Sequence, residues 1–193
     1  MLIENHKVVS NPRDLYHPSL QYFNLPGDFK LENGACLTDT TIAYRTFGTL
    51  NADKSNVIWV CHALTADSNP TDWWSGLVGS KALITPKKYF IVCANIIGSC
   101  YGSTGPRDFN PNTGERYLRN FPSITLRDIV KAQDRLRKHL GISTIALGIG
   151  GSMGGQQLLE WSLLQPSVFQ KLALVACSAK SSPWGIAIRS AQR

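Results

Sequence analysis

The feature that most constrains the fold is a series of near-continuous apolar runs separated by longer, mostly polar stretches. The runs are residues 57–61, 89–94, 144–149 and 171–177. Apolar runs of this length, without polar alternation, are typical of strands buried on both faces of a parallel sheet. They are far shorter than the roughly 18 to 20 apolar residues of a membrane-spanning helix. The sequence therefore predicts a buried parallel sheet and no membrane span.

Helices are predicted after the second and third runs. Residues 125–140 carry apolar side chains at helical spacing, begin with the capping-box pair Thr125 and Asp128, and are followed by Gly141 as a C-cap candidate. A second helix is predicted over residues 152–165. Alternation of strands and helices favours an α/β fold whose parallel connections are right-handed.

The N-terminal part has a different pattern. Residues 1–25 are polar and interrupted by prolines, and we expect an irregular lead-in there. Residues 29–37 alternate around Asn33-Gly34, which predicts a β-hairpin, and residues 41–47 predict a further strand. We therefore expect antiparallel strands leading into one α/β core domain over residues 26–193.

Composition limits the class of protein. With 193 residues, 43% hydrophobic and 17% charged, the chain can form one core, which excludes a disordered tail or a repeat array. The net charge of +7 is spread along the chain, so it predicts neither nucleic acid nor a membrane as a partner. The N-terminus lacks the pattern of a signal peptide, and we expect a cytoplasmic protein.

The five cysteines form no Cys-x-x-Cys pair, so their spacing predicts neither a metal site nor a redox motif. For those within apolar runs we expect small buried thiols in a reducing compartment. The cysteines are Cys36, Cys61, Cys93, Cys100 and Cys177.

The motif Gly-x-Ser-x-Gly occurs at Gly150, Ser152 and Gly154, between a predicted strand and a predicted helix. This is the context of a nucleophile elbow, in which a serine on a strained turn projects its hydroxyl into a cleft. Glycines at the flanking positions remove side chains that would collide with the turn. The N-terminus of the following helix favours a developing oxyanion, and the Met153 amide is one candidate donor.

A second oxyanion donor is expected after the run 57–61. There His62 closes a predicted strand, and Leu64 is the candidate for the second amide. His62 itself could be a catalytic base. We favour a bracing role, because the base follows the serine in chain order in this architecture.

Other interpretations of the glycines are less favoured. A dinucleotide fingerprint starting at Gly148 would place Met153 where glycine is needed, and Lys180 lies where an acidic residue is expected. The loop 98–105 lacks the lysine of a phosphate-binding loop, and fits instead a glycine-rich loop at the carboxyl end of a strand. A tight turn at Ser152 with no chemistry also remains open.

Several motifs together resemble the homoserine O-acetyltransferase family. The match is specific, since the motifs are long and occur in the family's order from about residue 20 onward. They are CHALT at 61–65, DWWSGLVG at 72–79, NIIGSCYGSTGP at 95–106, and GGSMGG at 150–155 followed by LEW at 159–161.

The resemblance implies an α/β-hydrolase fold and a Ser–Asp–His triad. It implies ping-pong transfer of an acetyl group from acetyl-CoA, a co-substrate, to the hydroxyl of L-homoserine in methionine biosynthesis, with no bound cofactor or metal and a homodimeric full-length enzyme. Ser152 corresponds to the nucleophile, and the amides of Leu64 and Met153 correspond to the oxyanion hole. The residues Gln156-Gln157 depart from the usual Met-Gln, which leaves the nucleophile intact but changes the packing beneath it.

A larger departure concerns the catalytic aspartate and histidine. In the family these residues, the later strands, the helical lid and a substrate-binding arginine lie in a C-terminal portion. The histidines here are His6, His17, His62 and His139, and none follows Ser152. A serine without a base is a weak nucleophile. We therefore expect 26–193 to be an incomplete core domain, inactive alone.

Alternatives stay open at this point. The acyl donor could be succinyl-CoA, the acceptor could be serine, or water could be the acceptor in a carboxylesterase. The chain could also be a non-catalytic fragment.

Overall fold

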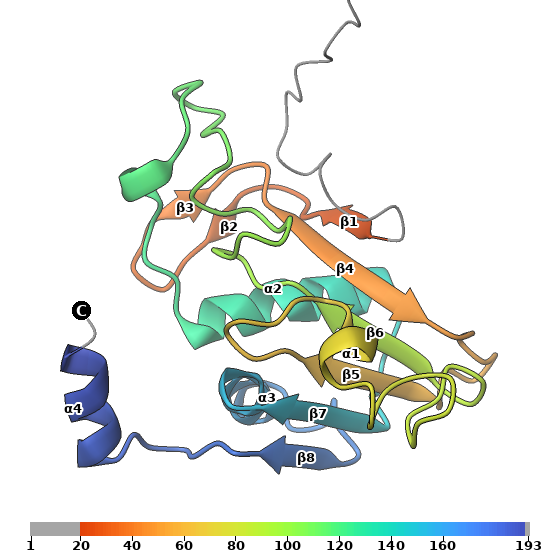
Figure 1. Cartoon of the computed structure of the whole chain (residues 1–193). Helices are drawn as coiled ribbons and strands as arrows, with labels where there is room; N and C mark the ends of the chain where they lie inside the picture. The colour runs from red at the N-terminus through yellow and green to blue at the C-terminus, as the bar shows by residue number, and fades with distance from the viewer. Residues whose placement is uncertain (1–19, 192–193) are drawn as a thin grey trace, which may run out of the picture.

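The computed structural model describes residues 20–191, and six strands in this range form one mixed sheet in the order β1-β4-β6-β5-β7-β8 (Figure 1). The strands β6, β5, β7 and β8 are parallel, whereas β1 and β4 are antiparallel to their neighbours. The α/β-hydrolase topology expected from the sequence is confirmed. The strands are β1 (Gln21–Asn24), β4 (Thr41–Phe47), β5 (Val57–Cys61), β6 (Phe90–Ala94), β7 (Leu147–Gly151) and β8 (Leu172–Val175).

The N-terminal hairpin is confirmed, and the prediction for the residues before it needs one correction. The pair β2 (Phe29–Lys30) and β3 (Cys36–Leu37) is antiparallel. The lead-in 1–25 was expected to be irregular, but Gln21–Asn24 forms β1 because its backbone pairs with β4, a contact that the local sequence pattern does not reveal. Residues 1–19 lie outside the described range.

The third apolar run forms its strand later than predicted. The run covers residues 144–149, but β7 extends over Leu147–Gly151. Ile145 forms only an isolated bridge with Phe169. The strand therefore leads directly into Ser152, with no loop between them.

Both predicted helices are present, and they pack on one face of the sheet against each other. They are α2 (Leu126–His139) and α3 (Met153–Leu164). The capping box of α2 is confirmed, since Thr125 Oγ1 accepts from the Asp128 amide at 3.2 Å and the Thr125 amide donates to Asp128 Oδ2 at 3.1 Å.

Shorter elements complete the chain. The short helix α1 (Pro70–Trp73) lies over the sheet face opposite α2 and α3, and a 3₁₀ turn occupies Leu118–Asn120 (Figure 1). Helix α4 (Pro183–Ala191) follows an extended segment and stands apart from the sheet (Figure 1).

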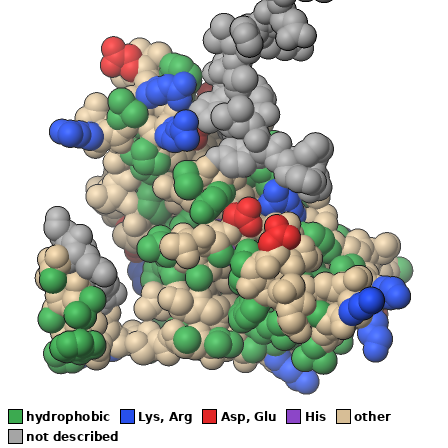
Figure 2. Space-filling view, in the orientation of Figure 1, with side chains coloured by type: hydrophobic (Ala, Val, Ile, Leu, Met, Phe, Trp, Pro, Cys, Tyr) green, Lys and Arg blue, Asp and Glu red, His purple; other side chains and the backbone are tan. Residues whose placement is uncertain are grey.

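The described end of the chain exposes apolar surface. Trp184 of α4 is 74% exposed, and apolar side chains gather on this helix in the space-filling view (Figure 2). Leu174 and Val175 of β8, the last strand in the sheet order, are also exposed. No helix within residues 20–191 is long and apolar enough to cross a bilayer.

Candidate active site at the carboxyl edge of the sheet

Ser152 occupies a sharp turn between β7 and α3. Its backbone has φ 54° and ψ −120°, a conformation that non-glycine residues rarely adopt. The turn is held by hydrogen bonds on both sides: the Ser152 amide donates to Val175 O at 2.9 Å, and Ser152 O accepts from the Gln156 amide at 3.2 Å. The residue is exposed, so its hydroxyl is accessible. This is the geometry that the elbow motif predicted.

The two glycines of the motif are required by close backbone contacts. A Cβ on Gly150 would lie 2.5 Å from the carbonyl carbon of Gly154. A Cβ on Gly154 would overlap the carbonyl oxygen of Cys61 and lie 2.7 Å from its carbon. Helix α3 therefore begins in backbone contact with the end of β5, which brings the nucleophile turn and the loop after β5 together.

The candidate oxyanion amides belong to these two segments. Met153 is the first residue of α3, where amides have no intrahelical partner. Leu64 lies in the loop after β5, its side chain is 69% exposed, and its amide donates to no described residue. The structure places both amides at the carboxyl edge of the sheet, and their role in oxyanion binding stays a prediction.

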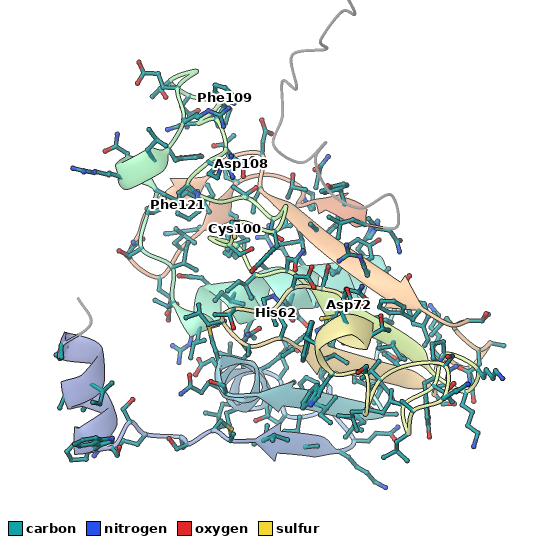
Figure 3. The ribbon with its side chains drawn as sticks, viewed as in Figure 1. His62, Asp72, Cys100, Asp108, Phe109 and Phe121 are labelled. Carbon is teal, nitrogen blue, oxygen red and sulfur yellow. The ribbon has the colours of Figure 1, made fainter. Side chains whose placement is uncertain are left out.

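His62 is buried at the carboxyl end of β5, inside the molecule (Figure 3). Its Nδ1 lies 2.8 Å from Ala63 O, so Nδ1 carries the proton and donates to this carbonyl. Burial lowers the pKa of His62, while the hydrogen bond to Ala63 and the charge of Asp67 oppose this shift. The structure thus gives His62 the bracing position that we expected. Among residues 20–191, no side chain forms a hydrogen bond with Ser152 Oγ.

The glycine-rich loop 98–105 follows β6 at the carboxyl edge, and Cys100 in this loop is labelled in Figure 3. Its polar residues bind the backbone of β4. Ser103 Oγ accepts from the Ala43 amide at 2.9 Å, and Thr104 Oγ1 accepts from the Thr41 amide at 2.8 Å. The loop therefore extends the hydrogen bonding of β4. The hydroxyls of Ser103 and Thr104 are used in these bonds to the strand.

The cysteines differ in exposure. Cys61 and Cys93 are buried, and burial raises the pKa of both thiols. Cys36 and Cys100 are exposed, and Cys177 is half-buried. The expectation of buried thiols within the apolar runs holds for Cys61 and Cys93 and is wrong for Cys177, which follows the end of β8 and is only half-buried.

Sequence patterns alone did not reveal a pair of buried amides beneath the elbow. Gln133 of α2 and Gln157 of α3 are almost completely buried, and Gln133 Nε2 donates to Gln157 Oε1 at 2.7 Å. A signal was present in the sequence: Gln133 occurs at helical spacing from Ile129 and Leu136, on the apolar face of the helix. A polar residue at such a position requires a buried partner.

Comparison with known proteins agrees with this geometry. Residues 56–192 match the family described as alpha/beta hydrolase fold. The chain belongs to the alpha/beta hydrolase fold family. Residues 147–164 have the strand, strained serine turn and helix that form the nucleophile elbow in this fold, and the role of Ser152 as the nucleophile stays a prediction.

Curated relatives of this alpha/beta hydrolase fold protein are homoserine O-acetyltransferases. The protein of that name from Trichormus variabilis is 45% identical over 183 residues, which are 95% of this chain and 51% of the relative. The one from Cyclobacterium marinum is 52% identical over 163 residues, covering 84% of this chain and 46% of the relative. The chain thus spans about half the length of these relatives.

Solved structures of the same fold carry two kinds of name. Homoserine O-acetyltransferase from Bacillus anthracis is 29% identical with a TM-score of 0.78, over 85% of this chain and 48% of that one. An acetylester hydrolase from Corynebacterium glutamicum is 32% identical with the same TM-score of 0.78, over 89% of this chain and 48% of that one.

Proposed function

We propose that this chain provides the nucleophile and the oxyanion amides of a homoserine O-acetyltransferase. The observation that carries the proposal is the strained Ser152 turn at the start of α3, in contact with the loop that carries Leu64. The homoserine O-acetyltransferases among the curated relatives, 45% and 52% identical to this chain, support the acetyl donor and the homoserine acceptor.

The first half-reaction forms an acyl-serine. Ser152 Oγ attacks the thioester carbonyl of acetyl-CoA, and a general base takes its proton. The amides of Met153 and Leu64 stabilise the negative charge that develops on the carbonyl oxygen. The tetrahedral intermediate then expels the CoA thiolate, which is protonated, and leaves an acetyl ester on Ser152.

The second half-reaction transfers the acetyl group. The homoserine hydroxyl loses its proton to the base and attacks the ester carbonyl, and the same amides hold the oxyanion. The bond to Ser152 Oγ breaks, the serine is reprotonated, and O-acetylhomoserine leaves. This ping-pong order accounts for a single strained serine acting on two substrates in turn, as in the methionine-biosynthesis step that we infer.

The base must come from outside the described residues. The two histidines of the described range are occupied elsewhere: His62 is buried and donates to Ala63 O, and His139 stacks on Phe23 with ring centroids 4.2 Å apart. We therefore infer that residues 1–193 alone transfer acetyl groups poorly. Removal of a triad member leaves only about 10³ to 10⁴-fold acceleration over water, from the oxyanion hole and binding.

A chimera tests this proposal. The C-terminal half of the Trichormus variabilis relative is joined after Arg193, and acetyl transfer from acetyl-CoA to homoserine is measured in the chimera and in the 193-residue chain. We expect turnover in the chimera and none above background in the chain alone. S152A in the chimera is the control and should abolish turnover.

A second candidate function is ester hydrolysis, favoured by the 32% identity to the acetylester hydrolase. Water then replaces homoserine as the acceptor, with the same nucleophile and amides. A chimera that hydrolyses acetyl esters but never acetylates homoserine would contradict the transferase proposal and support the esterase. Robust transfer by residues 1–193 alone would contradict the inferred need for an external base.

A further inference from the structure

A continuous chain of buried hydrogen bonds crosses the protein beneath the elbow. Trp59 Nε1 of β5 donates to Gln133 Oε1 at 2.8 Å, and Gln133 Nε2 donates to Gln157 Oε1 at 2.7 Å. Gln157 Nε2 then donates to the carbonyl oxygen of His62 at 3.2 Å. All four residues are at most 1% exposed. The chain links β5, α2 and α3 to the loop after β5.

The two end groups of this hydrogen-bond series, the Trp59 indole and the His62 carbonyl, fix the donor-to-acceptor direction of every bond in it. An indole nitrogen can only donate a hydrogen bond, and a backbone carbonyl can only accept one. Gln133 must therefore present its oxygen to Trp59, and Gln157 must present its nitrogen to His62. Gln133 Oε1 also accepts from Cys61 Sγ at 3.7 Å. If either amide rotated by 180°, it would lose its hydrogen bonds to both of its neighbours in this network. A residue of equal size but different hydrogen bonding cannot replace Gln157.

This series of hydrogen bonds ends at the proposed oxyanion hole. The His62 carbonyl is two residues before Leu64, and Gln157 is one helical turn after Met153 on α3. The carbonyl oxygens of Cys61 and His62 also border Gly154. Gln157 is thus the side chain that ties the loop with one candidate amide to the helix with the other.

We propose that Gln157 is a positioning residue: through its bond to the His62 carbonyl it holds the Leu64 amide in register with the Met153 amide. The inference rests on the proposed function, since it concerns the oxyanion hole of that reaction. A displacement of about 1 Å in such a hole is enough to lower the rate about 100-fold. Gln157 touches neither substrate nor the reacting atoms.

The neighbouring Gln156 offers a matched control. It is half-buried, its side chain has no hydrogen bond among the described residues, and the related motif usually has methionine there. The same change, glutamine to methionine, can therefore be made one residue apart. Q157M removes two hydrogen bonds of the series, those to Gln133 and to the His62 carbonyl, whereas Q156M removes none.

The first test uses the 193-residue chain and needs no activity. The Ala66 amide donates to Ala63 O at 3.1 Å and reports on the loop, while amides of β6 report on the core. In Q157M, the hydrogen-exchange rate of the Ala66 amide should rise about ten-fold more than the rates of the β6 amides, because the loop loses its hydrogen bond to Gln157 while the core keeps its own. Q156M should leave this difference unchanged. Equal acceleration of loop and core in Q157M would overturn the anchoring.

The second test uses the chimera described above. Q157M should lower kcat at least about ten-fold and leave the KM for acetyl-CoA within about two-fold, because the amides act on the transition state. Q156M should keep both values. Equal kinetics in Q157M and Q156M would overturn the proposal. If the wild-type chimera transfers nothing, the proposed function fails, and the exchange experiment still decides the anchoring.

Q157E distinguishes the hydrogen bond of residue 157 from the packing of its side chain, because glutamate has nearly the same size as glutamine. It also tests the proposal if Q157M does not fold. An ionised carboxylate cannot donate to His62 O, but a protonated carboxyl can, while its other oxygen still accepts from Gln133. Burial raises the pKa of such a carboxyl. Near the hydrogen-bond network, burial raises the pKa of the Cys61 thiol and lowers the pKa of the His62 imidazole, which favours the neutral form of both, while the charge of Asp67 opposes the shift of His62. Relative to wild type at each pH, kcat of Q157E should recover as the pH falls, and a constant ratio would contradict the proposal.

Discussion

Ser152 holds a backbone conformation that costs a serine about 1 to 3 kcal/mol, and the hydrogen bonds of the turn keep it there. Glycine adopts this region without strain, although it adds entropy to the unfolded chain. We therefore expect S152G to increase the free energy of unfolding by about 1 kcal/mol over S152A. Urea denaturation of the two variants measures this difference, and equal stabilities would show that the turn stores no strain.

His62 makes the free energy of unfolding depend on pH. Its imidazole is buried, and this burial holds its pKa in the folded state below the usual value of 6.5. Between about pH 6.5 and the lower pKa of the folded state, the unfolded chain binds a proton that the folded chain does not, so stability falls as the pH falls through this range. The slope for one proton reaches about 1.4 kcal/mol per pH unit.

The variant H62N should remove this contribution. We expect the loss of unfolding free energy between pH 7 and pH 5 to be smaller in H62N than in wild type, measured by urea denaturation at both pH values. An identical loss in both proteins would mean that His62 takes up its proton in the folded state.

At the scale of elements, the close contact between α3 and β5 places the Ser152 turn next to the loop after β5. Glycine to alanine inside a helix ordinarily stabilises by about 0.5 to 1 kcal/mol. G154A should do the opposite, and destabilise by about 1 to 3 kcal/mol, because the new Cβ overlaps the Cys61 carbonyl. Thermal unfolding measures the change.

The control for this prediction is G76A. Gly76 is exposed and has no positive φ, and a Cβ added there would meet no heavy atom within 4 Å. We expect the substitution to change stability by less than about 0.5 kcal/mol. Equal effects of G154A and G76A would contradict the close approach of α3 to β5.

The sequence predicts elements well where the signal is local. The capping box at Thr125, the hairpin around Asn33-Gly34 and the serine elbow each depend on residues a few positions apart, and all are present. Strand β1 depends on pairing with β4. Helix α4 was not predicted, although it begins at Pro183 directly after Ser182, whose Oγ accepts from the Gly185 amide at 3.1 Å. Periodicity alone does not predict these two elements.

The site follows the same division. Ser152 could be found from its glycines, because the steric need acts over two residues. The Gln133–Gln157 pair could not be found as a pair, because it joins two helices that only the folded sheet brings together. The proposed oxyanion role of Leu64 came from its place after a strand and from resemblance, and it stays a prediction.

At the scale of the whole molecule, the described residues contain the strained Ser152 turn, and neither described histidine forms a hydrogen bond with its hydroxyl. The chain spans about half of the Trichormus variabilis and Cyclobacterium marinum relatives, and the apolar side chains of β8 and α4 are exposed at the described end. In the proposed function, Ser152 carries the acyl group and a base from outside the described residues takes its proton. Acetylation of Ser152 is the step on which this mechanism depends.

One measurement tests this step most directly. The chimera is mixed with acetyl-CoA in the absence of homoserine, quenched in acid, digested, and mapped by mass spectrometry. We predict one acetyl group on the peptide that contains Ser152, its loss when homoserine is added before the quench, and no such peptide in S152A. Turnover with no acetyl group on Ser152, or with the group on another residue, would contradict the proposed mechanism.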